Sequence, residues 1–113
     1  MVYSPHDLRK ANLRATYMAS YNISITSTGN PSPSSLNCSP GDKITWTNNY
    51  TKSISAFTLP SCVSPQTSPA PIAVGGTTQT YTVNSGVNGN FSYSYTFAAQ
   101  IDADTRSGTI DVS

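Results

Sequence analysis

The amino-acid sequence predicts an all-β domain, a β-sandwich of about seven short strands. From residue 21 onward, apolar and polar residues alternate with a period of two, as in strands that bury one face. Glycine, proline and asparagine interrupt this alternation at short intervals, which is typical of turns. Only 10% of the residues are charged, and serine, threonine and asparagine supply most of the polarity, so the composition favours strands and turns over surface helices.

Residues 1–20 differ in composition from the rest of the chain, so we treat them separately from a single domain at residues 21–113. They hold three of the six basic residues and the only histidine. Ser4 and Pro5 suit the cap and the first position of a helix, and apolar residues recur at helical spacing from Leu8 to Met18. The segment is therefore interpreted as a short N-terminal helix or arm, or as an expression-derived leader.

The strands are expected at residues 21–25, 36–38, 44–46, 55–59, 79–83, 91–97 and 110–112. Residues 60–71 carry four prolines and are predicted to form a long loop. In residues 91–97 four aromatic side chains alternate with Asn, Ser and Thr. An exposed aromatic strip could stack on sugars or bases, but strict alternation favours a buried face. The core is expected to contain Ile44, Trp46, Phe57, Tyr81, Phe91, Tyr93, Tyr95, Ile110 and Val112.

Two separated segments carry a family resemblance. The first is Gly41-Asp42-Lys43-Ile44-Thr45-Trp46-Thr47-Asn48, and the second runs from Gly89-Asn90-Phe91-Ser92-Tyr93-Ser94-Tyr95 to Ser107-Gly108-Thr109-Ile110-Asp111-Val112. Together they resemble the first and last core strands of the cupredoxins, the small copper-carrying β-sandwiches. The resemblance covers roughly the last four-fifths of the chain and implies a cupredoxin-like Greek-key topology.

The residues that would hold copper in that family are absent. The resemblance implies a copper-binding histidine shortly after the Trp46 strand, and Ile54 occupies that position. It also implies a cysteine, a histidine and usually a methionine before the final strand, and residues 93–108 contain none of these types. A blue copper site needs two imidazoles, a thiolate and a weak axial ligand. The sequence therefore predicts a metal-free protein without a cofactor and without the electron-transfer role of the family.

Cys38 and Cys62 are the only cysteines and lie on either side of the Trp46 strand. Such a pair forms a disulfide when the protein meets an oxidising compartment. The alternative is two free thiols, with Cys38 filling an apolar core position. The disulfide would favour an extracellular or cell-surface location, and free thiols would favour the cytosol.

The acidic segment at residues 102–108 is weakly similar to a calcium-binding loop. Asp102 and Asp104 supply alternate carboxylates, but Arg106 occupies the place of a third acidic ligand. We therefore interpret the two carboxylates as caps of a tight turn. No paired carboxylates, nucleophile–base pair or phosphate loop is visible, so the chain is not expected to be an enzyme.

These observations favour a structural or protein-interaction module that assembles with further copies of itself. Strand edges with few charged residues would invite pairing. The alternative is a carbohydrate or small-ligand binding domain that uses loop aromatics such as Tyr50. A net charge of +1 gives no attraction to nucleic acid, and the apolar runs are too short for a membrane span.

Overall fold

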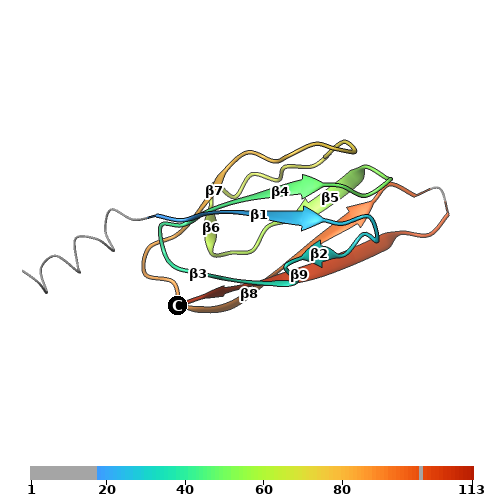
Figure 1. Cartoon of the computed structure of the whole chain (residues 1–113). Helices are drawn as coiled ribbons and strands as arrows, with labels where there is room; N and C mark the ends of the chain where they lie inside the picture. The colour runs from blue at the N-terminus through green and yellow to red at the C-terminus, as the bar shows by residue number, and fades with distance from the viewer. Residues whose placement is uncertain (1–17, 100) are drawn as a thin grey trace, which may run out of the picture.

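The computed structural model describes residues 18–99 and 101–113, which fold into two β-sheets packed face to face (Figure 1). The nine strands are β1 (Ser20–Ile25), β2 (Pro31–Ser32), β3 (Ser35–Cys38), β4 (Lys43–Asn48), β5 (Ile54–Thr58), β6 (Val63–Ser64), β7 (Tyr81–Val83), β8 (Gly89–Phe97) and β9 (Asp104–Val112). The described residues include no helix that is long and apolar enough to cross a membrane. The predicted all-β sandwich is confirmed.

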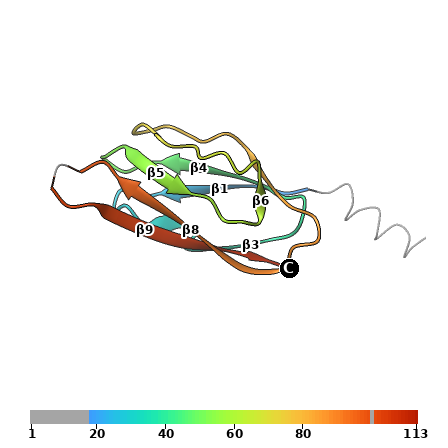
Figure 2. The ribbon, with the colours of Figure 1, turned by 180° about the vertical axis from the view of Figure 1, so that it is seen from behind.

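The strand order is β2-β1-β4-β7-β6 in one sheet and β3-β9-β8-β5 in the other. The chain changes sheet repeatedly, so strands that follow one another in sequence often face each other across the core. The pairs β1–β4 and β3–β9 are parallel, and the remaining pairs are antiparallel. Figure 2 shows the sandwich from behind, where the long strands β8 and β9 form an antiparallel hairpin. These two strands are the central strands of the four-stranded sheet.

Trp46 lies at the centre of the core and is 0% exposed. Its ring contacts Phe57, Tyr81 and Tyr93 edge-on, with centroid distances of 5.1, 5.8 and 5.2 Å. Edge-to-face contacts between aromatic rings stabilise a core beyond the burial of their area alone. The predicted core is confirmed except for Phe91, which is only half-buried.

Three expectations about element boundaries were wrong. Nine strands replace about seven, because β2 and β6 are pieces of two residues in segments expected to be loops. The strand expected at residues 79–83 begins at Tyr81. β9 begins at Asp104, so residues 104–108 are extended and do not form the tight turn expected there. Pairing with β8, from Phe97↔Asp104 onward, overrides the turn-like composition of this segment.

The helix expected within residues 1–20 falls mostly outside the described residues, and Ser20 already belongs to β1.

Three of the four sheet edges, those at β2, β6 and β5, are guarded by proline or by a loop, whereas the edge at β3 is open. Pro31 stands in the edge strand β2, and Pro65 follows the edge strand β6. The outer edge of β5 is covered where Ile54 and Ile72 exchange two backbone hydrogen bonds of 2.9 Å. The hydroxyl of Ser68 also donates to the Phe57 carbonyl at 3.1 Å. Short, proline-bearing or covered edges discourage pairing with another chain, even where charges are few.

Candidate functional site

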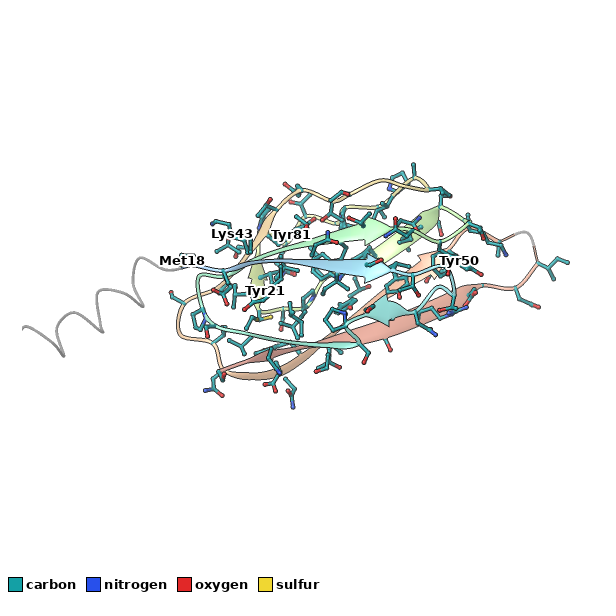
Figure 3. The ribbon with its side chains drawn as sticks, in the orientation of Figure 1. Met18, Tyr21, Lys43, Tyr50 and Tyr81 are labelled. Atoms are coloured by element: carbon teal, nitrogen blue, oxygen red, sulfur yellow. The ribbon has the colours of Figure 1, made fainter. Side chains whose placement is uncertain are left out.

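The two ends of the sandwich differ, and we name them here. At the loop end, β4 and β8 finish at Asn48 and Phe97, and β5 and β9 begin at Ile54 and Asp104. At the base end, β1, β4 and β8 begin and β3 and β9 finish. Figure 3 places Tyr50 at the loop end and Met18, Tyr21 and Lys43 towards the base end. The loop end is where the family resemblance implies copper ligands, so it is the first candidate site.

Ile54 takes the position of the implied copper-binding histidine and is 0% exposed. Its alkyl side chain packs in the core and offers no donor atom to a metal ion. Within residues 18–99 and 101–113, no group of three histidine, cysteine, aspartate or glutamate side chains comes together as a metal site.

A cluster of Tyr50, Phe97, Asp104 and Arg106, which we call the Arg106 cluster, closes the loop end. The Tyr50 and Phe97 rings lie 4.4 Å apart, and the Arg106 guanidinium stands 5.8 Å from the centre of the Phe97 ring. Nε and Nη2 of Arg106 donate to the two carboxylate oxygens of Asp104 at 2.7 and 3.0 Å. The Arg106 guanidinium holds the pKa of the Asp104 carboxyl below its usual value, chiefly through these hydrogen bonds.

Arg106 also fixes the turn between β1 and β2. Its Nη1 donates to the Thr28 carbonyl at 3.0 Å and to the Asn30 side-chain oxygen at 2.9 Å. The Asp104 carboxylate is therefore committed to Arg106, and Asp102 stands exposed on the loop. The two carboxylates do not converge as a calcium loop would require.

Asn48 is the second organising residue of the loop end and is 0% exposed. Its side-chain amide donates to the carbonyls of Lys52 and Ile72 at 2.9 and 3.3 Å, and its side-chain oxygen accepts from the Tyr50 amide at 3.0 Å. Its backbone carbonyl accepts from Gly75 at 2.6 Å. One buried amide thus holds the loop after β4 against the loop at residues 72–76. Asn48 was not among the predicted site residues, although it closes the motif that carried the resemblance.

Tyr50 was the aromatic residue proposed to contact a ligand. It is half-buried, and its ring packs on Phe97. An open hollow of about 610 Å³ lies nearby, lined by Lys52, Ala98, Ala99, Ile101 and Asp102. Large apolar side chains at this end are exposed on two loops, with Ile101 at 92% and Val74 at 56%. The loop end therefore exposes two large apolar side chains, together with the charged side chains of Lys52 and Asp102.

Both cysteines lie at the base end and are buried free thiols in this structure, with no disulfide between them. Burial raises the pKa of the Cys38 thiol to about 11, with further contributions from Cys62, Asp42 and Asp111. Burial also raises the pKa of Cys62. Thiols that stay protonated are poor nucleophiles.

Asp42 fixes the start of β1 at the base end. Its two carboxylate oxygens accept from the Ala19 and Ser39 amides at 3.0 and 2.9 Å. The buried carboxylate therefore connects the residue before β1 to the turn before β4. These hydrogen bonds explain why the sequence motif has an aspartate at position 42.

Comparison with known proteins supports the fold. No protein-family model matches the chain, and no curated protein matches its sequence. Among solved structures, the chain is similar to a purple cupredoxin from Nitrosopumilus maritimus, with a TM-score of 0.56 and 17% sequence identity. The match covers 81% of this chain and 98% of that one. At this identity the likeness shows the fold alone. The fold is cupredoxin-like, and the described residues hold no evident copper site.

Proposed function

We propose that this cupredoxin-like sandwich is a non-catalytic, metal-free module that acts by contact, and that its principal partner is a second copy of the same chain. The observation that carries the proposal is the loop end. The segments that would converge on a metal ion close on one another there, through Ile54, Asn48 and the Arg106 cluster. The polar groups of these residues are paired internally, and the loop end also exposes the large apolar side chains of Val74 and Ile101.

The exposed side chains of Val74 and Ile101 form the contact surface in this proposal. Apolar side chains exposed together on one end of a small domain are a feature of interaction sites. Because three of the four sheet edges are guarded, pairing of edge strands is a poor route to assembly, which moves the expected contact from the edges to the loop end.

Charge favours a second copy as the partner. Residues 1–17 contain three basic residues and one acidic residue, whereas residues 18–113 contain three basic and four acidic residues. The N-terminal segment of one copy therefore carries the opposite sign to the domain of another, which favours their encounter. This segment joins the domain at the base end, beside Met18, and the apolar surface lies at the loop end. The resulting contact is head to tail, a geometry that builds rings or filaments.

Sedimentation and light scattering across a wide range of protein concentrations test the proposal. We expect the mass of the full-length protein to rise with concentration, and Ile101→Asp to move that rise to at least about 10-fold higher concentration, a shift of about 1.4 kcal/mol. Ser92→Asp adds the same charge at an exposed position within β8, outside both ends that form the proposed contact, and should change nothing. A wild-type protein that stays monomeric throughout would remove self-assembly.

The hollow at the loop end favours small-ligand binding as the second candidate function. Lys52 and Asp102 place opposite charges beside the apolar side chains of Ala98 and Ile101. Among the described residues, the exposed large apolar side chains are Met18, Val74 and Ile101, so the surface lacks the exposed aromatic platform on which sugars stack. A small zwitterionic ligand fits this chemistry better than a glycan. Titration calorimetry with aliphatic amino acids, on wild type and on Lys52→Ala, would detect such a site.

A further inference from the structure

The base end carries a feature that contact at the loop end does not use. Cys38 is 5% exposed and Cys62 is 0% exposed, and both belong to the same hydrophobic core. Cys38 ends β3 in the four-stranded sheet, and Cys62 immediately precedes β6 in the five-stranded sheet. A bond between them would therefore join the two sheets covalently at the base end.

Backbone hydrogen bonds connect both cysteine segments to the end of β7. The Cys62 carbonyl accepts from the Asn84 amide at 2.8 Å, and the neighbouring Val83 carbonyl accepts from the Gly41 amide at 2.8 Å. Gly41 stands three residues after Cys38. Cys62 is also among the groups that raise the pKa of Cys38, which places the two side chains within range of each other's charge. The two thiols thus share one corner of the core, and the chain contains no other cysteine.

We propose that Cys38 and Cys62 form a cross-sheet disulfide, and that the choice between dithiol and disulfide is made while the chain folds and is then retained. In the folded dithiol both sulfurs are closed off from solvent, so a small disulfide cannot reach them. In the unfolded chain both sulfurs are accessible to a small disulfide. Both thiols then have the ordinary pKa of an exposed cysteine, so a fraction of each is present as the reactive thiolate. Burial that prevents oxidation of the folded dithiol also protects the folded disulfide from reduction.

The chemistry requires a small disulfide such as glutathione disulfide as the oxidant. One cysteine thiolate attacks the small disulfide, forming a mixed disulfide and releasing one small thiol. The second cysteine thiolate then attacks the protein-bound sulfur, forming the Cys38–Cys62 bond and releasing the other small thiol. The two protein thiols lose two protons and two electrons, and the small disulfide gains them as two thiols.

The test compares oxidation of the protein during refolding with oxidation of the protein after it has folded. Reduced, unfolded protein is refolded in glutathione disulfide, and folded, reduced protein is placed in the same solution for the same time. Each sample is then unfolded without reductant, alkylated and weighed by mass spectrometry. We expect the refolded sample to be two hydrogens lighter and unalkylated, and the folded sample to carry two alkyl groups.

Two results would overturn the proposal. Free thiols or two mixed disulfides after oxidising refolding would show that the cysteines do not pair. Equal oxidation of the folded and refolding samples would show that burial does not set the redox state. Where pairing occurs, the folding equilibrium constant of the disulfide form should exceed that of the dithiol form by on the order of 100-fold. Cys38→Ala and Cys62→Ala should each abolish that difference, while the two wild-type samples decide the question even if either variant fails to fold.

Discussion

Tyr93 and Tyr95 allow a matched test of how polar groups contribute to this core. Both project from β8, each is 1% exposed, and their rings lie 6.3 Å apart. The Tyr95 hydroxyl donates to the carbonyl of Gly29 at 2.9 Å. The Tyr93 hydroxyl is buried and forms no well-aligned hydrogen bond, although Nε1 of Trp46, which is unpaired too, lies close enough to interact with it. Replacing each residue with phenylalanine removes the same atom from two environments that differ in this one respect.

We expect the two substitutions to have different signs. Tyr95→Phe removes a buried hydrogen bond and leaves the Gly29 carbonyl without its partner, which should lower the free energy of unfolding by about 1–2 kcal/mol. Tyr93→Phe removes a hydroxyl that loses water on folding and gains only a poorly aligned contact with Nε1 of Trp46. It should leave the free energy of unfolding unchanged or raise it by up to about 1 kcal/mol.

Urea unfolding, followed by tryptophan fluorescence, measures both effects. The two variants should then differ by about 1–3 kcal/mol, which at a slope of about 2 kcal/mol per molar urea separates their midpoints by roughly 0.5–1.5 M at an unchanged slope. Tyr21→Phe, at a half-buried position, serves as the control and should stay within about 0.5 kcal/mol of wild type. If Tyr93→Phe destabilises the protein as much as Tyr95→Phe does, the Tyr93 hydroxyl has a partner, such as a buried water, and the reasoning is refuted.

Four further predictions concern the core and the loop end. Trp46→Ala should lower the free energy of unfolding by about 3–5 kcal/mol, as a large deletion from the core centre; a much smaller loss in a urea titration would contradict the burial of Trp46. Gly108→Ala should lower it by about 1–3 kcal/mol, because the new methyl carbon would lie 2.5 Å from Cζ of Tyr93; the loss should vanish in a Tyr93→Ala background. Since burial raises the pKa of Tyr93 to about 12, stability should be complete below the unfolded value of about 10 and fall as pH rises from about 10 towards 12; the fall in urea midpoint should be shallower for Tyr93→Phe. Cu(II) should give no intense blue absorption band with the wild-type protein, and a stoichiometric band would overturn the metal-free assignment.

Much of the fold follows from the sequence, because one buried face per strand imposes an alternation that survives in the residue order. Trp46, Tyr93 and Tyr95 were placed correctly in the core on this basis, whereas Phe91 was not. The alternation says less about where strands begin. The segment from Asp104 to Gly108 has turn-like composition, and only its pairing with the neighbouring strand makes it extended. The strands β2 and β6 consist of two residues each, which is too short for any period to show.

The loop end was harder to foresee, because its contacts join residues that are distant in sequence. Arg106 binds the turn at Thr28, 78 positions earlier, and the Asn48 amide reaches Ile72, 24 positions later. An arginine between two polar residues gives no sign of such a partner. Asn48 offered a weak signal, since an asparagine that ends an alternating strand is a candidate to cap the turn that follows.

The same geometry explains why the sandwich can keep its fold without a metal ion. In a copper site, ligands from two loops are drawn together by one cation, so the metal itself organises the loop end. Here the same segments are held by Asn48, which bonds two loops at once, and by Arg106, which joins β9 to the β1–β2 turn. The Asp104 carboxylate is already hydrogen-bonded to Arg106, and the Asn48 side chain is buried and hydrogen-bonded. These two side chains therefore have few free donor or acceptor groups for a ligand. The loop after β4, the loop at residues 72–76 and the turn between β1 and β2 are therefore fixed by residues of the chain itself, in the place where a copper site would rely on the metal ion.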